Sequence, residues 1–129
     1  MNYTVYAIRC ETTGRVYVGC TKDLKTRVYA HFGDLRNGRK DMFNHFSKHR
    51  EKTQWQKDYD KYGRGDFKIY VLENNVNESA RQDREEYWIA QYRATDKRFG
   101  YNTRAHVKRE GFSVEPDIPP LPLAKEEAT

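Results

Sequence analysis

Residues 3–19 read YTVYAIRCETTGRVYVG and predict a β-hairpin with a tyrosine on each strand. Both ends of this segment are rich in β-branched and aromatic residues, which favour strands. The residues between them have turn composition, and Gly14 can adopt the positive φ that a tight turn needs. A hairpin of this kind places Tyr6 and Tyr17 on neighbouring strands, so the two phenol groups are expected to share one site.

A helix is expected to follow the hairpin, with its N-cap at Thr21 and its end at Gly38. Its apolar residues fall at helical spacing and predict one buried stripe, made of Leu24, Val28, Phe32 and Leu35. Arg27 and His31 are four residues apart and share a face that borders this stripe. From this border both side chains are expected to reach into a cleft beside the packed helix.

Three further elements are expected along the chain. Residues 53–62 predict a second helix, whose Trp55 is expected in the core, and the alternating residues 67–71 predict a third strand. A last helix is expected over residues 77–92. We interpret residues 39–54 as an insertion that contains a short helix and a loop.

The last predicted helix, capped by Asn77, carries an acidic residue within its apolar stripe. Glu85 precedes the apolar residues of that stripe, which are Trp88, Ile89 and Tyr92. An ionised carboxylate in such a place is costly unless it is paired or binds a metal. A buried ion pair with Arg81 or Arg84 is therefore the alternative to a metal site, and Glu86 is expected to be solvated.

The charge of the chain is divided between a basic domain and an acidic tail. Residues 113–129 contain four prolines and have a net charge of −3. Since the net charge of the whole chain is +5, residues 1–112 have a net charge of +8. The domain is expected to comprise residues 1–112, and the tail to be extended or disordered. A basic domain indicates an anionic partner, for which nucleic acid is the first candidate.

The composition excludes several classes of protein. No apolar run approaches the roughly 18 residues that a membrane span needs, and the N-terminus lacks a signal-peptide pattern. The two cysteines, Cys10 and Cys20, have the spacing of neither a zinc cluster nor a disulfide framework, and both are expected to stay reduced. We therefore expect a soluble cytoplasmic protein with no membrane partner.

The order of these residues resembles that of the GIY-YIG endonuclease superfamily, and above all the catalytic module of phage intron-encoded homing endonucleases. The positions that carry the resemblance are Val5-Tyr6, Tyr17-Val18-Gly19, Arg27, His31, Glu85 and Gly100-Tyr101-Asn102. It implies an α/β (α+β) fold with a small central three-stranded antiparallel sheet flanked by helices. It also implies a DNA endonuclease in the cytoplasm of a bacterial or phage-infected cell.

The resemblance implies a role for each aromatic residue of the site. Tyr6 lies beside the attacking water and either deprotonates or orients it, with His31 as a relay, and Tyr17 contacts the scissile phosphate. A tyrosine with a reference pKa of about 10 is a weak base at neutral pH unless its pKa is lowered or its proton is relayed, and a nearby metal and His31 could supply that help.

The remaining site residues are implied to handle negative charge. Arg27 neutralises the phosphate, Glu85 holds one divalent cation, and Asn102 supports the site at the edge of the core. A planar guanidinium suits two phosphate oxygens, and Mg²⁺ needs few protein ligands because it keeps several waters. Mg²⁺ or Mn²⁺ is therefore the expected cofactor.

A set of basic residues is a candidate phosphate-contacting surface, and a plain solvated face is the alternative. Its members are Lys22, Lys25, Arg36, Arg39, Lys40, Lys48 and Arg50.

Neither zinc-finger spacing nor a helix-turn-helix pattern follows residue 103. Sequence specificity is therefore expected to come from the insertion, from self-association or from a partner. Two other functions stay open: a non-catalytic nucleic-acid-binding module with the same fold, and the catalytic fragment of a longer site-specific endonuclease.

Overall fold

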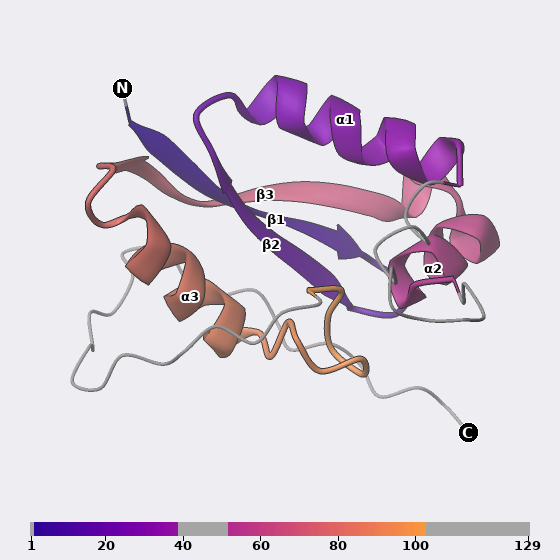
Figure 1. Cartoon of the computed structure of the whole chain (residues 1–129). Coiled ribbons are helices and arrows are strands. Elements are labelled where there is room, and N and C mark those ends of the chain that lie inside the picture. Colours follow the sequence, from indigo (N-terminus) through magenta and orange to yellow (C-terminus); the bar gives the residue numbers. More distant parts are fainter. Residues whose placement is uncertain (1, 39–51, 103–129) are drawn as a thin grey trace.

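The structure is a computed structural model that describes residues 2–38 and 52–102. It contains a three-stranded antiparallel sheet flanked by three α-helices, which confirms the predicted fold class (Figure 1). Most of the predicted insertion and the predicted tail lie outside the described residues. The same holds for four residues of the predicted phosphate-contacting surface, which are Arg39, Lys40, Lys48 and Arg50.

The sheet is built around the first strand. Strand β1 (Tyr3–Cys10) lies between β2 (Val16–Thr21) and β3 (Phe67–Val76), and both pairings are antiparallel. Tyr6 faces Gly19 across the β1–β2 ladder, and Ile8 faces Tyr17. Since residues two apart on a strand point to the same face, the two tyrosines are diagonal neighbours on one face of the sheet.

Strand β3 extends five residues beyond the predicted end at Val71. The predicted strand was too short because the polar run Glu73-Asn74-Asn75 interrupts the apolar alternation. Pairing with β1 continues through this run with a register irregularity, and the Thr4 hydroxyl donates to Asn74 Oδ1 at 3.1 Å. Backbone pairing therefore carries the strand past the point where its side-chain pattern ends.

Both faces of the sheet are covered (Figure 1). On one face, Val5 and Val18 pack against Trp88 of α3 (Arg81–Gln91). On the other face, Tyr6 and Ile8 pack in a second core cluster with residues of α1 (Leu24–Arg36) and α2 (Gln54–Tyr62). Alternate residues of β1 therefore enter two separate cores, which is why the strand is apolar without interruption from Val5 to Ile8.

The predicted N-cap of α1 was wrong by two residues. Asp23 caps the helix, because its carboxylate accepts from the backbone N–H of Thr26 at 3.2 Å. The Thr21 hydroxyl instead accepts from the backbone N–H of Asp23 at 3.1 Å and shapes the turn before the helix. Both residue types are good caps, and only the position of the first helical turn decides between them. The helix ends at Arg36, and Gly38 follows with φ 71°.

The second helix confirms its prediction to within one residue. Thr53 is the N-cap of α2, with its hydroxyl accepting from the backbone N–H of Gln56 at 3.2 Å. Gly63, at φ 79°, ends the helix, and a short 3₁₀ helix, η2 (Arg64–Asp66), leads into β3. Gln54, at the end of the predicted insertion, is the first residue of this helix.

The N-cap of the last helix is Ala80, three residues after the predicted cap Asn77. The Asn77 side chain accepts from the backbone N–H of Ala80 at 3.0 Å, so it caps the turn that precedes α3 rather than α3 itself. The predicted apolar stripe of Trp88, Ile89 and Tyr92 is buried as expected. No helix among residues 2–38 and 52–102 is long and apolar enough to cross a membrane.

The segment after α3 returns to the start of β2. The backbone N–H of Tyr101 donates to the carbonyl of Val16 at 2.9 Å, and Gly100 forms a bridge with the same residue. A Cβ atom at Gly100 would lie 2.2 Å from the Cα of Ala94, so this close approach requires glycine. The return places residues 100–102 beside the tyrosine-bearing strand.

Candidate active site

Tyr6 and His31 form the centre of the candidate site. The Tyr6 hydroxyl lies 2.8 Å from Nε2 of His31, within hydrogen-bonding distance, and both side chains are buried. Tyr6 comes from the middle of β1 and His31 from α1, which packs over it. A proton can therefore pass between a phenol and an imidazole away from bulk water.

Tyr17 completes the aromatic cluster from the neighbouring strand. Its ring lies 4.8 Å from the His31 ring in an edge-on arrangement and 6.3 Å from the Tyr6 ring, measured between centroids. The predicted shared site for the two phenol groups is therefore present in the geometry. Burial is the main cause that raises the pKa of both tyrosines, so both hydroxyls carry their protons at neutral pH.

Arg27 lies one helical turn before His31 and is exposed. Its guanidinium lowers the pKa of both Tyr6 and Tyr17, through its positive charge and as a donor to the hydroxyls, against the larger effect of burial. The two residues of the predicted helix face therefore differ in burial. His31 lies inside the protein and Arg27 at its surface.

Glu85 approaches the cluster from the other side of the sheet. Burial, and after it the Glu85 carboxylate, raise the pKa of Tyr17, and the same two causes raise the pKa of Cys20 to about 11. Cys20 belongs to the face that α3 covers, whereas Tyr17 belongs to the opposite face. Because β2 is the outer strand, a carboxylate at its edge can act on groups of both faces.

Arg84 and Glu86 are the neighbours of Glu85 on α3. The buried Arg84 donates from Nε to Glu73 at 2.8 Å, so this arginine has an ion-pair partner on β3. Glu86 was expected to be solvated, but it is partly buried, like Glu85, and accepts from Gln82 at 3.2 Å. Both neighbouring glutamates are therefore partly buried, and Glu86 has a hydrogen-bond partner on its own helix.

Asn102 holds the outer strand of the sheet. Its Oδ1 accepts from the backbone N–H of Val18 at 2.9 Å, and its Nδ2 donates to the Val18 carbonyl at 2.9 Å. An edge strand leaves such backbone groups without partners in the sheet, and the amide supplies both. Asn102 thereby fixes the strand between Tyr17 and Gly19.

Gly19 is the residue over which Tyr6 packs. A Cβ atom at this position would lie 2.5 Å from the Tyr6 hydroxyl oxygen, which is too close for any side chain. Replacing Gly19 with alanine is expected to displace the hydroxyl and lower the rate of the reaction by about 100-fold, because small displacements of reacting groups are costly. Steady-state and single-turnover rates on plasmid DNA measure this effect.

Gly33→Ala is the matched control for this prediction. Gly33 lies within α1, and nothing lies within 4 Å of a Cβ atom at this position. The control is expected to retain activity and to gain up to about 1 kcal/mol of stability, because alanine is the better helix former. Equal activity of the two variants would show that the contact between Tyr6 and Gly19 does not position the hydroxyl.

Trp55 was expected only as a core residue, and it also forms one wall of the site. Its ring stacks on Tyr17 at 4.6 Å and on Tyr101 at 5.5 Å between centroids. It also lies 5.1 Å from the His31 ring. No local pattern in residues 53–62 predicts this arrangement, because the stacked residues come from distant parts of the chain.

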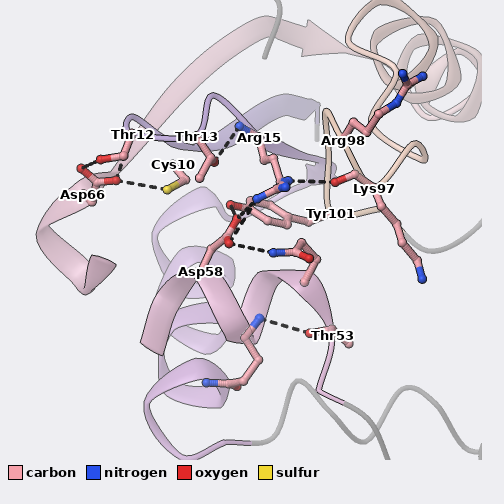
Figure 2. A network of polar contacts seen from close by, with 12 residues as sticks. Cys10, Thr12, Thr13, Arg15, Thr53, Asp58, Asp66, Lys97, Arg98 and Tyr101 are labelled. Atoms are coloured by element: carbon pink, nitrogen blue, oxygen red, sulfur yellow. Dashed lines mark hydrogen bonds and ion pairs between the residues drawn. The ribbon is translucent and has the colours of Figure 1, made fainter. Parts of the chain in front are cut away.

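A buried polar network holds this wall in place (Figure 2). Asp58 of α2 accepts from Arg15 Nη1 at 3.0 Å and from the Tyr101 hydroxyl at 2.6 Å. Arg15 also donates from Nε to the Lys97 carbonyl at 2.8 Å. Burial and then the Asp58 carboxylate raise the pKa of Tyr101. The network joins α2, the hairpin and the segment after α3. No motif in the sequence points to its charged members, Arg15 and Asp58.

The described members of the predicted phosphate-contacting surface do not form one group. Lys22 and Lys25 are exposed at the start of α1, and Arg36 is exposed at its end. The 13 residues of this helix span about 20 Å at 1.5 Å per residue. Lys22 and Lys25 are therefore near each other, whereas Arg36 belongs to a different part of the surface.

Comparisons with known proteins agree with this geometry. The chain is similar in structure to a mutant of the catalytic domain of intron endonuclease I-TevI, with a TM-score of 0.64 and 25% identity over 83% of this chain and 98% of that chain. A second structure, the catalytic domain of homing endonuclease I-TevI, has a TM-score of 0.63 and 25% identity over 79% and 98% of the two chains. A search of curated proteins found no match. The family model of the GIY-YIG catalytic domain matches residues 2–102, and the chain therefore belongs to this family of nuclease domains.

Proposed function

We propose that this domain is a divalent-metal-dependent endonuclease that hydrolyses phosphodiester bonds in DNA. The observation that carries the proposal is the short contact between the Tyr6 hydroxyl and His31 Nε2, together with the charges of Arg27 and Glu85 that act on Tyr6. Together these groups can transfer a proton and stabilise the charge of a phosphate at a single site.

Tyr6 and His31 would carry the proton of the attacking water. The raised pKa of Tyr6 keeps its hydroxyl protonated, so this oxygen is a weak base by itself. When the hydroxyl proton passes to His31 Nε2, the Tyr6 oxygen can accept a proton from water in the same step. The hydroxide equivalent then attacks phosphorus, the P–O bond to the leaving oxygen breaks, and that oxygen takes up a proton from solvent, so bonds and protons balance.

Arg27 and Tyr17 would bind the scissile phosphate. The guanidinium of Arg27 already reaches both tyrosine hydroxyls and can offer paired donors to two phosphate oxygens. The protonated Tyr17 hydroxyl is a donor for a third oxygen. Together they would stabilise the negative charge that develops on the phosphate during the displacement.

The residues around Glu85 fit a metal of the Mg²⁺ or Mn²⁺ type. Such an ion keeps several waters and is held by one or two carboxylates, so a single glutamate can suffice. Such an ion would neutralise phosphate charge and stabilise the leaving oxygen when bound. Glu85 is the residue of this chain that would hold it.

A plasmid assay tests the proposal. Supercoiled DNA is incubated with the protein in Mg²⁺, in Mn²⁺ or in EDTA, and nicked and linear products are separated on a gel. We expect metal-dependent cleavage by the wild type and at least about 100-fold slower cleavage by Glu85→Gln, which removes the ligand charge and keeps the side-chain size. Binding of DNA by this variant is expected to survive.

Glu86→Gln is the matched control, since it changes the neighbouring, equally buried glutamate on the same helix. It is expected to cleave DNA at the wild-type rate. Equal loss in both variants would remove Glu85 as the specific metal ligand. A wild type that binds but cleaves no DNA with any divalent ion would identify a non-catalytic binding module instead.

The similarity to intron and homing endonuclease catalytic domains supports a homing-type role in a bacterial or phage-infected cell. We propose that target selection comes from self-association, from a partner or from residues outside 2–38 and 52–102. The described residues would carry out the hydrolysis. The plasmid assay tests this activity and does not test target selection.

A further inference from the structure

Two cations share one aromatic ring at the end of the sheet. Lys22 Nζ lies 5.2 Å from the centroid of the Tyr3 ring, and Arg81 Cζ lies 5.3 Å from it. The three residues come from three segments, namely the start of β1, the connection between β2 and α1, and the first residue of α3. These segments meet at the end of the sheet where the N-terminus lies (Figure 1).

This group lies next to the candidate active site. Arg81 precedes Glu85 by four residues on α3, so the two side chains share one face of the helix. Both charges act on the same thiol, because Glu85 raises the pKa of Cys20 and Arg81 lowers it. Cys20 in turn follows Gly19, which touches the Tyr6 hydroxyl. The cations therefore lie on the side of the sheet that α3 covers, with Arg81 one helical turn from Glu85.

The positive charge of this group is available to a ligand. Lys22 and Arg81 are exposed, and neither belongs to an ion pair among the described residues. An exposed cation–π contact contributes only about 0.5–1 kcal/mol, so the ring orients the two cations without neutralising them. Both cations therefore remain available to an anion at this end of the sheet.

We propose that Lys22 and Arg81, oriented by Tyr3, form a second phosphate-binding subsite that holds a DNA backbone phosphate next to the one cleaved. The inference rests on the proposed function, and it adds a contact that positions the strand rather than one that reacts. Arg81 offers the paired donors and Lys22 a compact charge, which is a common combination at phosphates. Of these residues only Lys22 was expected from the sequence to contact phosphate.

The salt dependence of DNA binding tests this subsite without relying on cleavage. The parent is the Glu85→Gln protein, and the affinity for a short labelled duplex is measured between about 50 and 200 mM KCl. Losing one phosphate contact is expected to reduce the slope of log affinity against log salt by about 0.9. We expect this reduction when Lys22→Gln and Arg81→Gln are added together.

Two controls separate a specific contact from a general loss of charge. Lys61 lies 5.3 Å from the Tyr62 ring on α2, so Lys61→Gln removes a lysine of the same kind from another surface, and the slope should not change. The exchange of Lys22→Arg with Arg81→Lys keeps both charges and should retain the parent slope.

The outcomes distinguish the two proposals. A parent that binds DNA with a slope unaffected by the double substitution would overturn the subsite and leave the proposed function standing. An equal reduction by Lys61→Gln would also overturn it, because the effect would then be one of net charge. A parent that binds no DNA at any of these salt concentrations would overturn both.

Discussion

Arg27→Ala is expected to slow DNA cleavage by about 100- to 1,000-fold while weakening DNA binding by less than about tenfold. The guanidinium lowers the pKa of both tyrosines, so in the proposed mechanism it lies where charge would develop on the phosphate. It is exposed at the surface of α1, and its removal therefore costs the fold little. Interactions that strengthen in the transition state affect the rate more than the affinity.

Single-turnover rates at several protein concentrations separate the rate of the chemical step from the affinity. Lys25→Ala is the control, because it removes an exposed positive charge two residues earlier on the same helix. Arg27→Lys is expected to recover only part of the rate, since an ammonium keeps the charge but loses the planar pair of donors. A loss of affinity with an unchanged rate would reassign Arg27 to DNA docking.

Asp58→Ala is expected to lower the free energy of unfolding by about 3–5 kcal/mol. The carboxylate is buried and accepts from the buried Arg15 guanidinium at 3.0 Å, from the Tyr101 hydroxyl and from Gln54. Its removal leaves the Arg15 charge in the interior without this partner. A domain of this size has a total stability of only about 5–15 kcal/mol, so the loss would be a large fraction of it.

Urea unfolding followed by circular dichroism measures this loss. Asp60→Ala is the control on the same helix, because Asp60 pairs with Lys52 at 2.8 Å at the surface. Exposed ion pairs contribute between zero and about 1 kcal/mol, and the control should stay within that range. Equal losses in the two variants would contradict the importance of the buried network.

Much of the site was predictable because its chemistry is carried by short local patterns. The hairpin signal in residues 3–19 places Tyr6 and Tyr17 on one face, and the structure has this arrangement. The spacing of Arg27 and His31 predicts a common helix face, and both reach the tyrosines. These inferences need only the periods of a strand and a helix.

Element boundaries were less predictable. Thr21 and Asn77 are good capping residues in composition, but each forms a local turn before its helix instead of capping it. The end of β3 was missed because backbone pairing with β1 continues through a polar run. In each case a hydrogen-bond donor or a neighbouring strand decides where the element begins or ends. The local sequence pattern does not show that donor or strand.

The sequence by itself determined which chemical groups the domain has, their order along the chain and the face of each element on which they lie. Only the tertiary structure decided that the Glu85 carboxylate raises the pKa of Tyr17, and that Trp55 stacks on both Tyr17 and Tyr101. The physical reason is that periodicity orients a side chain within its own element. The distance between elements is set by core packing and by buried contacts between residues far apart in the chain.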